Sequence, residues 1–213
     1  MRRILLLAGI AGAALTLAAC RPAAPAPAPD ATPNPAAQPA DERWVKGAAT
    51  STATLIEYSD FECPACASYY WLLKQVVAQT GERVRFSYRH FPLRQTHANA
   101  QLAAQAAEAA GLQGKFWEMH DRLFEGHDEW AGKPDARARF TAYAQALGLD
   151  LPRFTADLDA RATADAVEAD FQRGLEAGVR GTPTFYLNGR DIDHPGSVDE
   201  FRAVIEAALA PPQ

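Results

Sequence analysis

Three features are scarce in this sequence, and each scarcity excludes a class of protein. Cysteine occurs only three times, at positions 20, 63 and 66, which is too few for the disulfide framework of a small secreted domain. Positive charge is not in excess, because 21 Lys and Arg face 26 Asp and Glu, so nothing indicates nucleic acid as a partner. Long apolar runs are scarce too. The one at residues 4–17 is too short to be a transmembrane helix.

The N-terminal residues have the pattern of an export signal. Arg2 and Arg3 precede the apolar stretch, and Leu17-Ala18-Ala19-Cys20 follows as a small-residue cleavage site. This site resembles the lipobox of bacterial lipoproteins, in which the cysteine is acylated and becomes the first residue of the mature protein. We therefore expect residues 1–19 to be a lipoprotein signal peptide and Cys20 to carry a lipid. The alternative is an ordinary cleaved signal with an incidental cysteine.

The stretch after Cys20 is dominated by proline and alanine. Such a composition cannot bury a core and favours extended polyproline II structure, which at about 3.1 Å per residue can hold a domain up to roughly 60 Å from a bilayer. We expect residues 20–43 to be a tether, with a recognition segment for a proline-binding partner as the less favoured alternative. Residues 44–213 remain for one domain with a substantial core.

Periodicity in this remaining part predicts an α/β domain in three sections. Strand 52–59, helix 64–79 and strand 82–89 form a βαβ unit, and strands 184–187 and 190–192 with helix 198–209 form a ββα unit. Between the two units only helices are predicted, at residues 98–110, 115–124, 136–147, 152–158 and 164–177. The helical spacing of Tyr69, Tyr70 and Trp71 favours the core, and the alternative is a hydrophobic substrate groove.

The segment Cys63-Pro64-Ala65-Cys66 carries the strongest chemical signal. It lies where the first strand gives way to a helix, so its first sulfur lies at a helix N-terminus, where unpaired N–H groups favour a thiolate. We expect Cys63 to be exposed with a low pKa and Cys66, one turn later, to be buried. If a lipid occupies Cys20, these are the only thiols of an exported domain, so the pair is catalytic or metal-binding and not a structural staple.

A zinc site is the less favoured of these two interpretations. His90, His97, His120 and His127 are available to complete it, but no second C-x-x-C and no H-x₃₋₅-H pair is present. We therefore expect no metal and no other cofactor, and we assign these histidines to packing, capping and the surface.

Four stretches of the chain together resemble one known family. They are Asp60-Phe61-Glu62-Cys63-Pro64-Ala65-Cys66, Arg89-His90-Phe91-Pro92-Leu93, Gln113-Gly114-Lys115-Phe116-Trp117-Glu118-Met119-His120 and Gly181-Thr182-Pro183-Thr184-Phe185. In this order they are similar to the DsbA-like branch of the thioredoxin superfamily, in its monomeric type. The resemblance covers nearly all of residues 50–210. It implies a thioredoxin-like fold with an all-helical block, about residues 96–178, inserted between the βαβ and ββα units.

The resemblance also implies catalytic roles. Cys63 corresponds to the nucleophile that forms a mixed disulfide with substrate, and Cys66 to the sulfur that leaves from it or resolves it. Glu57 matches a buried acid that exchanges protons with Cys66, although the strand pattern alone also allows a glutamate at the strand edge that points to water. Pro183 matches a cis-proline opposite the two sulfurs.

Three further residues correspond to the family's substrate-binding surface. The Thr182 backbone would pair with an extended substrate chain as an added strand, and Pro64 and Ala65 lie between the sulfurs that the substrate approaches. Ala65 departs from the best-studied oxidases, which have a histidine there that helps to stabilise the thiolate. Asp60 and Glu62 add negative charge nearby, so we expect weaker stabilisation of the thiolate than in those oxidases.

The expected function is that of a membrane-tethered thiol:disulfide oxidoreductase that introduces disulfides into exported proteins. Its expected partners are cysteine-containing exported proteins, a membrane redox partner that resets the pair, and the membrane itself through the lipid on Cys20. We expect a monomer on the extracytoplasmic side of a bacterial membrane. The alternatives are a disulfide reductase or isomerase, and a non-catalytic thioredoxin-fold lipoprotein that acts as a chaperone or assembly factor. The intact C-x-x-C pair argues against the last of these.

Overall fold

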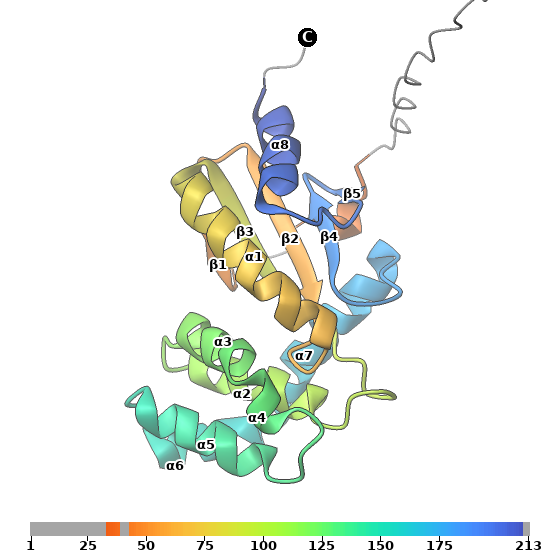
Figure 1. The fold of residues 1–213 in the computed structure, drawn as a ribbon. Helices are drawn as coiled ribbons and strands as arrows, with labels where there is room; N and C mark the ends of the chain where they lie inside the picture. The colour runs from red at the N-terminus through yellow and green to blue at the C-terminus, as the bar shows by residue number, and fades with distance from the viewer. Residues whose placement is uncertain (1–32, 39–42, 211–213) are drawn as a thin grey trace, which may run out of the picture. The chain divides into compact units, whose positions relative to one another are not determined.

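A mixed sheet forms the centre of the structure, a computed structural model that describes residues 33–38 and 43–210 (Figure 1). Its strands lie in the order β1-β3-β2-β4-β5. Their bounds are Val45–Lys46 (β1), Ala53–Ser59 (β2), Val84–His90 (β3), Thr184–Leu187 (β4) and Arg190–Ile192 (β5). Strands β2 and β3 run parallel, as a βαβ unit requires, and the other neighbouring pairs are antiparallel. The predicted α/β fold class is confirmed.

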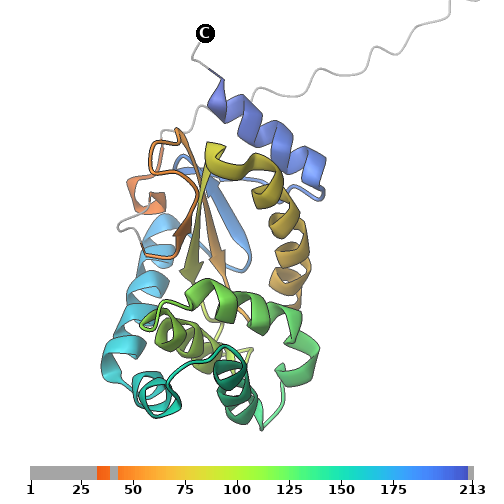
Figure 2. The same cartoon turned by 90° about the vertical axis from the view of Figure 1, so that its left-hand side faces the viewer.

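Helices cover both faces of the sheet, and a block of further helices lies beyond one end of it. Helices α1 (Pro64–Thr80) and α8 (Val198–Leu209) lie on one face and α7 (Arg161–Ala177) on the other (Figure 2). Beyond the carboxyl end of β2 lie α2 (Ala100–Gly111), α3 (Phe116–Glu125), α4 (His127–Trp130), α5 (Ala136–Ala146) and α6 (Leu151–Leu158). Two short 3₁₀ segments, η1 (Pro35–Ala37) and η2 (Gly81–Arg83), complete the described elements. Strand β1 and helix α4 were not predicted, because both are too short to show a period.

Side chains of β2 alternate between the two faces of the sheet. Leu55 packs in the core that α1 and α8 cover, whereas Ile56 and Tyr58 belong to the core under α7. Glu57 lies on the α1 side, because it lines a cavity together with Leu73 of that helix. Only 2% of Glu57 is exposed, so the alternative of a glutamate pointing to water is wrong.

Helix α7 lies within the predicted helical insertion of about residues 96–178, and it also reaches the sheet. It crosses from that block to the sheet and packs against β3 as well as α2. Gly174 allows this close approach, since a Cβ at this position would come within 2.6 Å of the Phe91 ring and 3.0 Å of the Tyr58 ring. The helical period alone cannot distinguish a helix packed on helices from one packed on a sheet, so the contact of α7 with the sheet was not predicted.

Part of the predicted tether packs against the domain. The Asn34 backbone N–H donates to the Gly189 carbonyl at 2.8 Å, and its side-chain amide donates to the Ala177 carbonyl at 2.9 Å. Ala37 is fully buried in the core under α7. Residues 33–38 therefore differ from the prediction of an unpacked tether, because alanine fits a tight contact and the segment's polar groups find partners. Arg43, the last residue of the predicted tether, is also described and pairs with Glu108 at 3.3 Å. The predicted signal peptide, Cys20 and the other tether residues lie outside the described residues.

We expect this docked segment to contribute to stability. Replacing Asn34 with alanine removes the bond to Ala177 and the cap of η1, in which the Asn34 side chain accepts from the Ala36 N–H. The free energy of unfolding should fall by about 1 kcal/mol in urea denaturation of the full chain. Gln38→Ala, at an exposed position of the same segment, is the control and should change it by less than about 0.5 kcal/mol. Equal effects of the two variants would show that Asn34 anchors nothing.

Candidate active site

The two cysteines lie where β2 is connected to α1. Cys63 is the N-cap residue of α1, and Pro64 takes the first helical position, where its missing N–H costs no hydrogen bond. Both sulfurs are free thiols in this structure. Cys66 is fully buried, as predicted, but Cys63 is also largely covered, with 7% of its surface exposed. Cys63 was expected to be exposed. In the structure it is the more accessible of two buried cysteines.

The environments of the two thiols shift their pKa values in opposite directions. A hydrogen bond from the Cys66 thiol, with further bonds from the backbone N–H groups of Cys66 and Ala65, lowers the pKa of Cys63 to about 5. Burial is the main cause that raises the pKa of Cys66 well above its usual value, and the neighbouring Cys63 and Glu57 add to it. The site therefore holds one thiolate nucleophile and one protonated thiol near neutral pH.

A loop from the other half of the fold lies against Cys63. The Thr182–Pro183 peptide bond is cis, and the Thr182 carbonyl oxygen lies 3.5 Å from the Cys63 sulfur. Pro183 is buried and its carbonyl accepts a hydrogen bond from His194 at 2.7 Å, whereas Thr182 is half-buried. A surface pocket of about 480 Å³ adjoins this loop and includes Thr182, Pro183 and His194 in its walls. The structure thus brings together residues that are about 120 positions apart in sequence.

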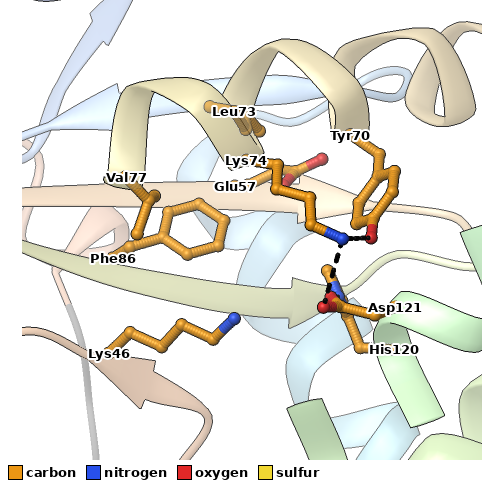
Figure 3. A pocket seen from close by; sticks show the side chains of 9 residues that line it. All are labelled: Lys46, Glu57, Tyr70, Leu73, Lys74, Val77, Phe86, His120 and Asp121. Atoms are coloured by element: carbon orange, nitrogen blue, oxygen red, sulfur yellow. Dashed lines mark hydrogen bonds and ion pairs between the residues drawn. The ribbon is translucent and has the colours of Figure 1, made fainter. Parts of the chain in front are cut away.

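Glu57 lies at the buried side of the pair, in the wall of a cavity of about 110 Å³ (Figure 3). Its Oε1 atom has no hydrogen-bond partner among the described residues, and burial raises its pKa to about 8. The opposite wall carries Lys46 of β1 and His120 of α3. Burial lowers the pKa of both, that of His120 to about 4, so the histidine is neutral at pH 7.

Asp60 and Glu62, the acidic residues before Cys63, connect the active-site loop to the helical block by hydrogen bonds. Asp60 accepts hydrogen bonds from the Leu93 N–H at 2.9 Å and from the His97 ring at 2.8 Å. Glu62 accepts from the backbone N–H groups of Asn99 and Gly132. Both carboxylates are buried, and these hydrogen bonds satisfy them. The expectation that their charge weakens the Cys63 thiolate stays a prediction.

Several residues of the site were not predicted from the sequence. His97 contacts Asp60, the His127 ring bonds the Glu62 carbonyl at 2.9 Å, and His120 lines the Glu57 cavity. These histidines were assigned to packing and the surface, because no spacing links them to Cys63. Trp71 was assigned to the core, but 52% of it is exposed and it lines a groove that begins at Pro64. Tyr70, by contrast, is buried as predicted.

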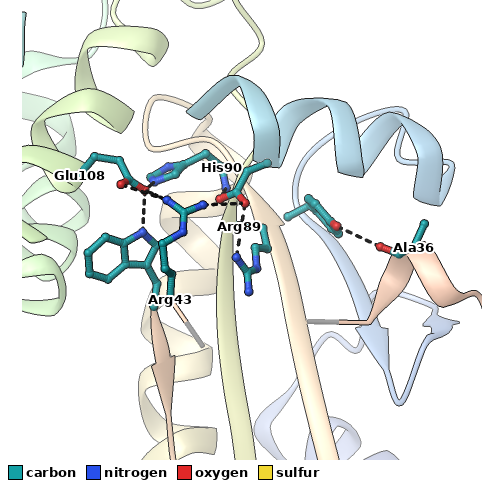
Figure 4. Close-up of polar contacts among 8 residues, drawn as sticks. Ala36, Arg43, Arg89, His90 and Glu108 are labelled. Atoms are coloured by element: carbon teal, nitrogen blue, oxygen red, sulfur yellow. Dashed lines mark hydrogen bonds and ion pairs between the residues drawn. The ribbon is translucent and has the colours of Figure 1, made fainter. Parts of the chain in front are cut away.

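One group of side chains in the described residues has the composition of a metal site. Ligand atoms of His90, Glu108 and Asp170 lie within 4.8 Å of one another. Figure 4 shows that arginines share this space: Arg43 contacts Glu108 at 3.3 Å and Asp170 at 3.5 Å, and Arg89 contacts Asp170 at 3.4 Å. Since these guanidinium groups already supply positive charge, the cluster fits a buried ion-pair network better than a cation site.

Comparison with proteins of known sequence finds relatives that are much longer than this chain. A Na⁺/H⁺ antiporter NhaA 3 from Salinispora tropica is 39% identical over 170 residues, which are 80% of this chain and 25% of that protein. A Na⁺/H⁺ antiporter NhaA from Herminiimonas arsenicoxydans is 35% identical over 164 residues, again 25% of its length. The chain therefore spans about a quarter of these relatives.

Solved structures with a similar fold match about four fifths of this chain. BdbD from Bacillus subtilis has a TM-score of 0.69 at 24% identity, over 78% of this chain and 92% of that one. Wolbachia pipientis alpha-DsbA1 has a TM-score of 0.71 at 18% identity, over 80% and 92%. These similarities show a thioredoxin-like fold with a helical insertion. A family profile described as thioredoxin matches residues 40–207. The chain therefore belongs to the thioredoxin family.

Proposed function

We propose that this protein is a thiol:disulfide oxidoreductase that transfers its Cys63–Cys66 disulfide to substrate proteins. The observation that carries the proposal is the contrast between the two thiols, a low-pKa sulfur at the start of α1 and a buried, high-pKa sulfur one turn later. A sulfur with a low pKa is a good leaving group and is stable as a thiolate, so it favours the reduced form of the pair. A pair whose reduced form is favoured acts as an oxidant toward other thiols. A non-catalytic binding protein has no need of such a pair.

The proposed reaction moves two electrons from substrate to protein. A substrate thiolate attacks the Cys63 sulfur of the oxidised pair, so a mixed disulfide forms while the Cys63–Cys66 bond breaks and Cys66 leaves as a thiolate. A second substrate thiolate then attacks the substrate sulfur of the mixed disulfide. Cys63 leaves as a stable thiolate, the substrate gains a disulfide, and the protein pair is reduced.

Glu57 is the proposed proton donor for Cys66. Because its pKa is raised to about 8, the carboxyl group is protonated at neutral pH and can give its proton to the departing Cys66 thiolate. The adjoining cavity, with Lys46 and His120 in its wall, provides a route for a proton from solvent back to Glu57. The Thr182 backbone, beside Cys63, is the proposed edge for an extended substrate segment.

We also propose that the protein acts at the outer side of a bacterial membrane, held by a lipid on Cys20. The basis is the lipobox-like Leu17-Ala18-Ala19-Cys20 sequence. The relatives are named as Na⁺/H⁺ antiporters, and the segment that matches this chain is about a quarter of their length. These names support a location at a membrane. None of the described helices is long and apolar enough to cross a membrane. The acylation prediction is checked by intact mass: cleavage at another position, with Cys20 unmodified, would remove the anchor.

Oxidase and isomerase functions can be separated with two substrates. Oxidised full-length protein is incubated with a reduced, unfolded two-cysteine protein and, separately, with a scrambled disulfide protein. We expect rapid oxidation of the first and little unscrambling of the second. Efficient unscrambling would overturn the oxidase proposal in favour of an isomerase, and reaction with neither would overturn an oxidoreductase function.

The residue between the cysteines gives a further prediction. Ala65 is exposed and supplies no charge, so Ala65→His adds a donor and a partial positive charge beside the Cys63 thiolate. The glutathione equilibrium should shift toward reduced protein by about tenfold, which for two electrons is about 30 mV. Ala65→Asn, similar in size and neutral, is the control and should shift it far less. A shift of the histidine variant toward the oxidised form would contradict the electrostatic argument.

A further inference from the structure

An apolar groove of about 400 Å³ lies between the segment that follows β3 and the last turns of α7. Leu175 of α7 lines this groove with 48% of its surface exposed, although few large apolar side chains are exposed in the described part of the chain. Single apolar side chains are common on protein surfaces, whereas a groove with apolar walls is typical of a binding site. The apolar side chains of its walls are Phe91, Pro92, Leu93, Phe171, Leu175 and Val179.

This groove continues to the loop beside Cys63. Arg180 lines both the groove and the pocket of about 480 Å³ that includes Thr182 and Pro183. Val179 precedes Thr182 by three residues, and an extended chain of this length spans at most about 11 Å. The Thr182 carbonyl oxygen in turn lies 3.5 Å from the Cys63 sulfur. An extended substrate segment whose cysteine reaches Cys63 can therefore place a side chain about three residues away in the groove.

Arg180 supplies a positive charge where the groove meets this pocket. Its side chain is exposed, and it forms no ion pair or hydrogen bond with any residue that the structure describes. The other arginine of the groove, Arg94, pairs with Glu168 at 2.8 Å and lies over the Phe171 ring at 4.6 Å. Asp191 lines the pocket from β5 and does not pair with Arg180. An acidic side chain of a bound segment is thus the partner that the charge of Arg180 favours.

We propose that this groove is a second substrate subsite and that Arg180 makes it selective for segments that are both acidic and apolar. The occupant is an extended segment of an unfolded exported protein, which pairs with the Thr182 backbone and places its cysteine at Cys63. It carries an Asp or Glu side chain opposite Arg180 and inserts an apolar side chain beside Leu175. This inference rests on the proposed function and adds the class of substrate that the site prefers.

The test uses oxidised full-length protein and reduced peptides with a single cysteine. The first peptide has Asp and Leu on both sides of the cysteine, so that either direction of binding presents them. The second has Lys in place of Asp, and the third has Ser in place of Leu. Two peptide thiols reduce one protein disulfide and form one peptide disulfide, and the rate constant is measured by alkylation and mass after acid quenching. Division by the rate constant of the same peptide with oxidised glutathione corrects for differences between the peptide thiols.

We expect wild-type protein to prefer the first peptide over each of the others by about threefold to tenfold. Arg180→Gln should reduce the preference for Asp over Lys by about threefold, and this loss should disappear at about 0.5 M salt, which screens exposed charges. Leu175→Ser should reduce the preference for Leu over Ser by about threefold at low and high salt alike. The controls are Arg190→Gln, exposed where β5 begins, and Leu112→Ser, 52% exposed at the end of α2.

Both control proteins should keep the wild-type preferences. Equal corrected rate constants for the three peptides, or the same losses in the controls, would overturn the subsite and leave the oxidoreductase function standing. Reaction of wild-type protein with none of the peptides would refute the proposed function, and this inference with it. In size-exclusion chromatography wild-type and Leu175→Ser proteins should both be monomers. A dimer that only the wild type forms would assign the groove to a second copy of the chain and overturn the proposal.

Discussion

Cys66→Ala protein, incubated with a disulfide-bonded substrate, is expected to accumulate mixed disulfides on Cys63, because the Cys63 thiolate attacks the substrate disulfide and one substrate thiolate leaves. Cys63→Ala protein should form none and lose all exchange activity. The physical reason is the division of roles between the two sulfurs. Cys63 has the depressed pKa and the greater exposure, and Cys66 is fully buried behind it. Without Cys66 no internal thiol can release the trapped substrate. Non-reducing electrophoresis and mass spectrometry after acid quenching measure the adducts.

Alkylation of the reduced wild-type protein provides the control for this assignment. At pH 6 a thiol with a pKa of about 5 is about 90% thiolate, whereas one at the ordinary value of 9.0 is about 0.1% thiolate. A limiting amount of iodoacetamide at pH 6 should therefore label Cys63 and leave Cys66 free. Labelling of Cys66 first, or adducts retained by the Cys63→Ala protein, would reverse the roles assigned here.

Glu57→Gln is expected to make the reduced protein more stable and the enzyme slower. Burial raises the pKa of Glu57 from 4.5 to about 8, so the folded state holds a proton that the unfolded state has lost. Between these two values the wild-type free energy of unfolding falls as pH rises, and the glutamine variant lacks this decline. At pH 7 the variant should be more stable by about 3 kcal/mol. Loss of the proton donor should slow substrate oxidation by about tenfold to a hundredfold.

The pH profile distinguishes this effect from a general change in packing. Below pH 4.5 both carboxyl and amide are neutral, so the two proteins should have nearly equal stability in urea denaturation. Their difference should grow up to about pH 8 and then level off. Glu82→Gln, exposed in η2 just after α1, is the matched control and should show no such growth. A difference that does not change between pH 4 and pH 8 would mean that Glu57 is ionised in the fold.

The local sequence predicted the elements that have a clear period and end at glycine or proline. Strands β4 and β5 and helix α8 were predicted with the bounds that the structure has, and α1 ends one residue later than predicted. The errors concern contacts between distant segments. No local pattern shows that residues 33–38 dock beside Gly189, or that Gly174 allows α7 to reach the sheet.

The same limit applies to the candidate site. Cys63, Cys66 and Pro183 were found because their motifs are contiguous in sequence, and the structure places Thr182 and Pro183 beside Cys63. The supporting histidines were missed, because His97 and His127 reach the loop only through the packing of the helical block. Tertiary contacts thus gave Asp60 and Glu62 a structural role that their charge alone did not predict.

The reduction potential of the Cys63–Cys66 pair tests the central claim most directly. It is measured by equilibrating the full-length protein with glutathione buffers at pH 7 and quantifying the reduced fraction. The lowered Cys63 pKa favours the reduced form, so we expect a potential between about −120 mV, the value of DsbA, and about −270 mV, that of thioredoxin, and nearer the first. A potential at or below that of thioredoxin, or a pair that does not titrate, would contradict an oxidase.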